Sequence, residues 1–139
     1  ANELHARENI LLENYYQVVL IEARTMAYML RKQILPAVFE YEAKLATIIQ
    51  TKKASGINSP LEEKILFNLY FTLGLYILYL ENLIDKVPAS EKEKAQYAAD
   101  ELLPLMEAIR TLTDSIEQNI PKDFWPLPDY NDLLFKSVQ

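Results

Sequence analysis

Side chains that could carry out chemistry are few and scattered along this chain. His5 is the only histidine and cysteine is absent, so neither a Ser-His-Asp or Cys-His nucleophile nor a Glu-x-x-His di-iron pair is indicated. The two glycines, Gly56 and Gly74, do not lie in a GxxxxGK or GxGxxG pattern that would hold a phosphate. We therefore predict no catalytic and no cofactor-binding residue in this chain.

Carboxylates are the remaining candidates, because several that converge can coordinate a hard cation. At helical spacing, a solvated helix face explains them better than a metal site does. The tyrosines at 70, 76 and 79 are likewise better explained as core residues than as a cofactor site. We predict no metal ligand, and the carboxylates considered are Glu40, Glu42, Glu62, Glu63, Glu81 and Asp85.

Composition limits the classes of partner. The 139 residues are half hydrophobic, which is enough for one domain over 1–139. A net charge of −6 and a pI near 4.8 disfavour a nucleic-acid or anionic-membrane partner, because both need concentrated Lys and Arg. The absence of cysteine is compatible with a cytoplasmic location. The uncharged run 65–80 is shorter than the roughly 20 residues of a membrane span, and we interpret it as a buried helix covered by other helices or another chain.

Apolar periodicity predicts a first helix over residues 4–54. The steps alternate between three and four, except for repeated fours after Met26, and Pro36 stands beside this irregularity. Because proline removes a helical hydrogen bond, we expect a continuous helix with a kink near residue 36. The expected stripe is Leu12, Tyr16, Val19, Ala23, Met26, Leu30, Ile34, Val38, Tyr41, Leu45 and Ile48.

Two further helices and a tail follow. Ser59 as cap and Pro60 predict a helix over 60–86, with the stripe Ile65, Leu69, Thr72, Tyr76, Tyr79 and Leu83. Ser90 and Glu93 form a capping box for a helix over 91–119, with the stripe Leu102, Leu105, Ile109, Leu112 and Ile116. The predicted fold is all-α: an antiparallel three-helix bundle with a long kinked first helix and an extended, Trp- and Pro-rich carboxyl-terminal tail over 121–139.

The first helix is too long for its partners. It would reach about 75 Å, against roughly 40 to 45 Å for each of the others. We expect about half of it, an apolar surface around residues 10–21, to lack a partner within the chain and to drive association as a homo-oligomer. The interface candidates are Leu12, Tyr16 and Val19 in this helix and Trp125, Tyr130 and Phe135 in the tail, with Trp125 expected to be largely buried.

Two motif blocks resemble a known family. The run ELHARENILLENYYQVVLIEARTMAYMLRKQILPAVFEYEAKLA, residues 3–46, is similar to the region that follows the catalytic domain in type III glutamine synthetases, with its ILLE-x-Y, IEA-x-TM and QILPA elements. The tail WPLPDYNDLLF, residues 125–135, is similar to that family's WP-x-P-x-Y-x-(D/E)-LLF ending. The resemblance covers nearly the whole chain, and Asn131 departs from it where glycine is expected.

The resemblance implies a parent enzyme that makes glutamine from glutamate, ammonia and ATP with a divalent metal, Mg or Mn. The motifs of its catalytic domain are not present here, so the chain would be a non-catalytic structural and assembly domain, a fragment whose partners are the catalytic domain and neighbouring subunits. The alternative is a stand-alone helical dimerisation or scaffold module. A ligand-binding helical sensor is weaker, because no convergent polar cluster is visible.

Overall fold

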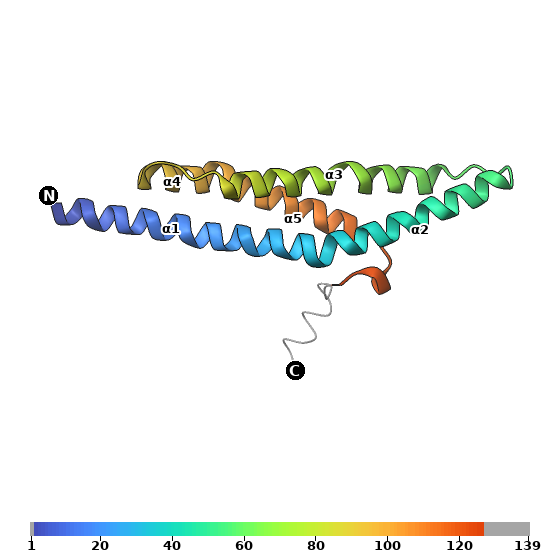
Figure 1. Ribbon diagram of the computed structural model, residues 1–139, viewed down its shortest axis with the longest axis horizontal. Helices are drawn as coiled ribbons and strands as arrows, with labels where there is room; N and C mark the ends of the chain where they lie inside the picture. Colours follow the sequence, from blue (N-terminus) through green and yellow to red (C-terminus); the bar gives the residue numbers. More distant parts are fainter. Residues whose placement is uncertain (1, 127–139) are drawn as a thin grey trace, which may run out of the picture.

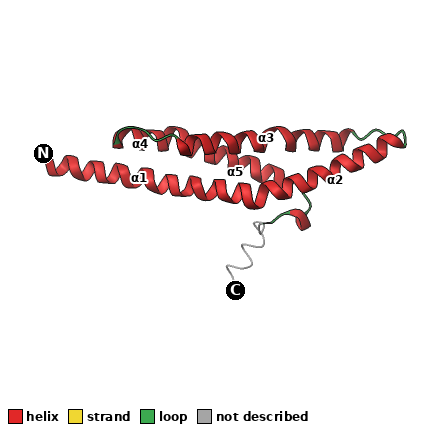
Figure 2. Cartoon of the chain, viewed as in Figure 1, coloured by secondary structure: helices red, strands yellow, loops and turns green. Residues whose placement is uncertain are grey.

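The computed structural model describes residues 2–126, apart from the side chains of residues 70–72. Within that part of the chain every regular element is a helix and no strand occurs, which confirms the all-α class and the three long helical stretches (Figure 2). The predictions that concern Tyr130, Asn131, Phe135 and the rest of the tail after Pro126 lie outside the described residues.

The first helical path runs through three consecutive elements. These are α1 (Asn2–Met29), the π-helical segment η1 (Leu30–Ile34) and α2 (Leu35–Ala54), and the path changes direction between α1 and α2 (Figure 1). The N–H of Leu35 donates to the carbonyl oxygen of Leu30, five residues back, as in a π-helix. The wider turn holds one extra residue, which accounts for the repeated steps of four. Pro36 follows directly and has no N–H to donate.

A tight turn joins α2 to α3 (Pro60–Asp85). Gly56 adopts a positive φ of 76°, and the N–H of Ile57 donates to the carbonyl oxygen of Lys52 at 2.8 Å. Lys52 also pairs with Glu62 at 2.5 Å across the turn. Ser59 occupies the cap position as expected, but its side chain makes no capping bond; its carbonyl oxygen accepts from the N–H of Glu63 instead.

The third helical path is α4 (Glu91–Tyr97), the π-helical segment η2 (Ala98–Leu102) and α5 (Leu103–Glu117), and it runs in the same direction as α1 (Figure 1). The predicted cap is present, because Ser90 Oγ accepts from the N–H of Glu93 at 3.2 Å. As in the first path, the π segment directly precedes a Leu-Pro pair, here Leu103 and Pro104. Tyr97 donates to the carbonyl oxygen of Leu83 at 2.5 Å and ties this path to α3.

The core lies where the three paths meet. The stripes predicted for the first and third helices are buried or half-buried throughout. The middle of the α3 stripe was wrong: Tyr76 and Tyr79 are exposed, and their places are taken by Leu73, Ile77 and Leu80. A helix that is apolar on all sides allows several stripes, and tyrosine tolerates exposure better than leucine because its hydroxyl group can bond to water.

The chain then crosses α2 in a short 3-10 turn, η3 (Lys122–Phe124), inside the segment expected to be extended. The ring of Phe124 lies 5.7 Å from that of Tyr41, and Lys44 Nζ lies 5.1 Å from the Phe124 ring centre. Trp125 packs against the edge of the core and is partly buried there, in line with the expectation that most of its side chain is covered.

The corrected α3 stripe can be tested by two substitutions two residues apart. Leu73 is fully buried and Leu75 is 65% exposed. We expect Leu73→Ala to lower the free energy of unfolding by about 2–5 kcal/mol and Leu75→Ala to change it by less than about 0.5 kcal/mol. Urea unfolding followed by circular dichroism measures both, and equal losses would contradict the assignment of the two faces.

Candidate functional site

The side chains that could take part in catalysis or metal binding do not gather at one place in the described part of the chain. No group of three or more His, Cys, Asp or Glu residues in the described part of the chain could hold a metal ion. Glu62 and Glu81 are each engaged in an ion pair, while Glu42 is half-buried and desolvation raises its pKa. His5 lies exposed in the first turns of α1. The surfaces of the helices are therefore the remaining candidates for function.

Two ion pairs join the first helical path to its neighbours, one from η1 and one from α1. Arg31 donates to both carboxylate oxygens of Glu81 on α3, at 2.9 and 2.5 Å, and this bonding lowers the pKa of Glu81. Lys94 on α4 pairs with Glu13 at 3.2 Å and lies 5.7 Å from the ring centre of Tyr16. Hydrogen bonds to its carboxylate lower the pKa of Glu13; the bond from Gln17 has the larger effect and the bond from Lys94 the next.

The contact with α4 corrects one expectation about the first helix. Residues 10–21 do not lack a partner, because α1 packs against α4 and η2 as well as α3. Tyr16 and Val19, two of the interface candidates, are buried within the chain at 2% and 4% exposure, and Leu12 is half-buried. Only the first turns of α1 extend past the end of α4 (Figure 1).

The opposite side of α1 remains apolar and uncovered. We call it the α1 outer strip; its members are Ile10, Leu11, Tyr15, Val18 and Ile21, which are between 39% and 69% exposed. Leu4, Leu11 and Val18 are seven residues apart, so they lie on one side of the helix, facing away from the buried Tyr16. A contiguous apolar strip of this kind marks an interaction surface.

A second strip lies on α3. The α3 outer strip consists of Phe67, Leu75, Leu78 and Tyr79, all at least half exposed. By length and composition α3 could cross a membrane, with a mean hydropathy of 1.2 and only 27% of the window buried, a test that core helices also pass. Within this chain the expected burial is present on one side of α3 only. The sequence analysis allowed for cover by another chain as well as by other helices, and that alternative stays a prediction for the other side.

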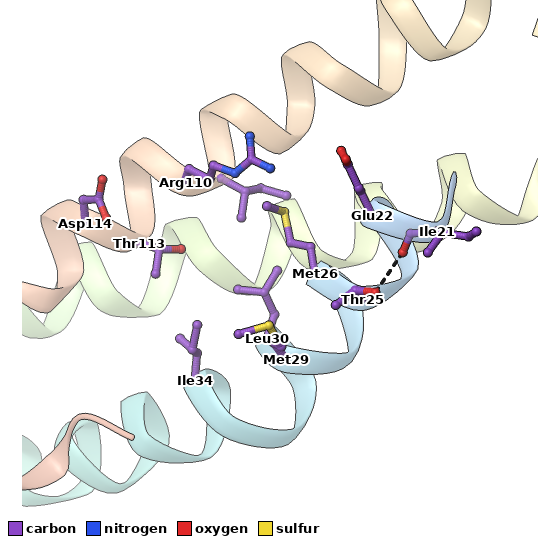
Figure 3. A pocket seen from close by; sticks show the side chains of 11 residues that line it. Ile21, Glu22, Thr25, Met26, Met29, Leu30, Ile34, Arg110, Thr113 and Asp114 are labelled. Carbon is purple, nitrogen blue, oxygen red and sulfur yellow. Dashed lines mark hydrogen bonds between the residues drawn. The ribbon is translucent and has the colours of Figure 1, made fainter. Parts of the chain in front are cut away.

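The third feature is a groove of about 620 Å³ between α1 and α5. We call it the α1–α5 groove. Figure 3 shows Met26 from α1 and Leu30 from η1 on one side and Thr113 facing them from α5, with Arg110 and Asp114 nearby on α5. The Oγ1 atom of Thr113 is buried and has no hydrogen-bond partner among the described residues. Periodicity did not predict this groove, because it lies beside η1, where the helix widens.

Comparisons with known proteins identify related sequences. The sequence model of a family described as Glutamine synthetase C-terminal domain matches residues 1–53. Glutamine synthetase from Butyrivibrio fibrisolvens is 31% identical over 140 residues, and Type-3 glutamine synthetase from Dictyostelium discoideum is 25% identical over 144 residues; each alignment covers 96% of this chain and 20% of the relative. The chain thus spans about a fifth of the length of these relatives. No solved structure matches the chain significantly. The resemblance inferred from the motif blocks is confirmed.

The ion pair between η1 and α3 predicts a pH dependence of stability. Because folding lowers the pKa of Glu81, its contribution is fully present above the unfolded-state value of about 4.3 and is lost as the pH falls through the lower folded-state value. We expect Glu81→Gln to cause a small loss of unfolding free energy at about pH 7 that decreases as the pH falls below about 4.3, small because both side chains remain partly exposed.

Urea unfolding at several pH values measures this difference. Glu107→Gln is the matched control, because Glu107 pairs with Arg110 only one turn away on the exposed side of α5. A Glu81→Gln loss that persists unchanged in acid would contradict the ion-pair explanation.

Proposed function

Since this chain is similar to the C-terminal domain of glutamine synthetase, we propose that it is the structural and assembly domain that follows the catalytic domain of a type III glutamine synthetase. The observation that carries the proposal is the alignment of nearly the whole chain with only a fifth of each relative. In this proposal the parent protein makes glutamine from glutamate, ammonia and ATP, and this chain alone is not an enzyme.

The surfaces support a role in assembly. The α1 and α3 outer strips are apolar, and each lies on the side of its helix opposite the core. They therefore face different directions, so one domain can contact two neighbours, such as the catalytic domain of its own chain and a second subunit. The proposal also takes residues 1–139 as one domain with the predicted antiparallel three-helix arrangement, in a cytoplasmic homo-oligomer without nucleic-acid or membrane partners.

ATP and the divalent metal, Mg or Mn, would be bound by the remainder of the parent protein. The described residues support this division, because their carboxylates are dispersed among separate ion pairs and helix faces. What this chain would contribute is a rigid body: its core side chains are fully buried from Leu30 in η1 to Leu73 in α3 and Met106 in α5.

The alternative is a stand-alone helical dimerisation or scaffold module. The seven-residue spacing of Leu4, Leu11 and Val18 favours it, since such spacing suits the pairing of two helices. The reading frame that encodes residue 1 separates the two proposals, because only the first requires a catalytic domain upstream.

The assembly role can be tested in the natural protein that carries these 139 residues. We expect Leu11→Glu with Val18→Glu to weaken association by at least about tenfold, because charges in the centre of an apolar interface must be desolvated. Sedimentation velocity measures the distribution of species. The matched control is Gln50→Glu with Ser115→Glu, which adds the same charge at exposed polar positions.

Both variants should keep an unfolding free energy within about 0.5 kcal/mol of the parent sequence per substitution, since all four positions are exposed. Unchanged association in the Leu11 and Val18 variant would argue against an interface at the α1 outer strip.

The chain alone should be catalytically silent. We expect purified residues 1–139 to show no ATP hydrolysis that depends on glutamate and ammonia, because the sequence encodes no phosphate-binding loop. A coupled phosphate-release assay with Mg²⁺ or Mn²⁺ measures this. Turnover that remains after a second purification and is lost when the protein is heat-denatured would refute the proposal that catalysis belongs to the remainder of the parent protein.

A further inference from the structure

We propose that the α1–α5 groove binds the carboxyl-terminal segment of this same chain, residues 127–139. The groove is apolar along its floor, where Met26, Met29 and Leu30 meet Ile109 from α5. Its volume of about 620 Å³ would hold several side chains at once. Methionine side chains adapt their shape to an incoming apolar group, which suits a segment with mixed aromatic and aliphatic residues.

The hydroxyl group of Thr113 points to the kind of occupant. Its Oγ1 atom is buried without a hydrogen-bond partner in the described structure, a state that costs free energy. If the segment binds in extended form, it presents backbone N–H and carbonyl groups to the groove, and a shift of the neighbouring side chains would let one of them bond to the hydroxyl. A helix from another protein would not serve as well, because its backbone groups are already bonded to one another.

The path of the chain brings this segment to the groove. η3 is held on α2 by the contacts of Phe124 with Tyr41 and Lys44. Tyr41 lies seven residues after Ile34, a groove residue, and thus about 10 Å further along the same side of the helix. From Ile34 to Ile21 the groove follows the helix for about 20 Å. The 13 residues after Pro126 reach up to about 43 Å when extended, more than the path requires.

The composition of the segment matches the groove. Pro128 reduces the entropy lost on docking, and the apolar residues are Leu127, Tyr130, Leu133, Leu134, Phe135 and Val138. Asp129 and Asp132 can approach Arg110, whose present partner Glu107 is an exposed neighbour on the same helix at 3.3 Å. Because the segment is covalently attached near the end of the groove, its effective concentration exceeds that of a second copy.

Thiol labelling of the full chain tests the proposal, since the sequence contains no cysteine. Met29→Cys places a reporter in the groove, and Gln50→Cys places a control on the exposed side of α2. Each is made with the natural segment and with Leu134→Asp and Phe135→Asp. If the segment occupies the groove nine-tenths of the time, the groove thiol should react with a maleimide about tenfold faster when the segment carries the aspartates.

The control thiol should react at the same rate in both backgrounds, and circular dichroism should show unchanged helix content. Thr25→Cys, at the exposed edge of the groove, is a second reporter if Met29→Cys fails to fold. Equal rates at the groove thiol with and without the aspartates would overturn the proposal. Protection that increases with chain concentration would also overturn it, because the occupant would then be the segment of a second copy.

Discussion

Hydrophobic burial along the first helical path is the interaction on which the other elements depend. From Tyr16 to Leu45 this path presents an apolar side that neither α3 nor the α4–α5 path could cover alone. The two paths cover it jointly, and the completely buried side chains of α3, η2 and α5 all belong to this contact. The ion pairs of Arg31 and Lys94 lie at the margins of that core, where they set the relative position of helices that apolar contact already holds together.

The same excess of apolar residues explains the exposed surfaces. A helix in a three-helix arrangement can bury only part of its circumference, yet α3 carries no charged residue from 65 to 80 and α1 is apolar on two sides near Val18 and Val19. The residues left outside form the two outer strips. Contiguous apolar strips of this kind are typical of interaction surfaces.

Much of this architecture could be predicted from the sequence. The stripe of the first helix, the stripe from Leu102 to Ile116 and the Ser90 cap depend on local patterns of spacing and capping, which a sequence displays directly. The orientation of α3 could not be predicted, because Leu73 and Leu75 are equally apolar and only the neighbouring helices decide which is buried. The coverage of Tyr16 by α4 and the groove beside η1 were missed for the same reason: both depend on where one helix crosses another.

The π-helical segment η1 also bears on how the length of this protein can vary during evolution. Adding or removing one residue in a regular α-helix turns everything beyond it by about 100°, which would move the core-facing side of α2 into water. Between Leu30 and Ile34 the extra residue is already accommodated, and without it the steps from Met26 to Ile48 would alternate regularly between three and four. A one-residue gap at this position in a homologue would therefore leave the buried surface intact, so sequences of this group should be aligned with the gap placed there.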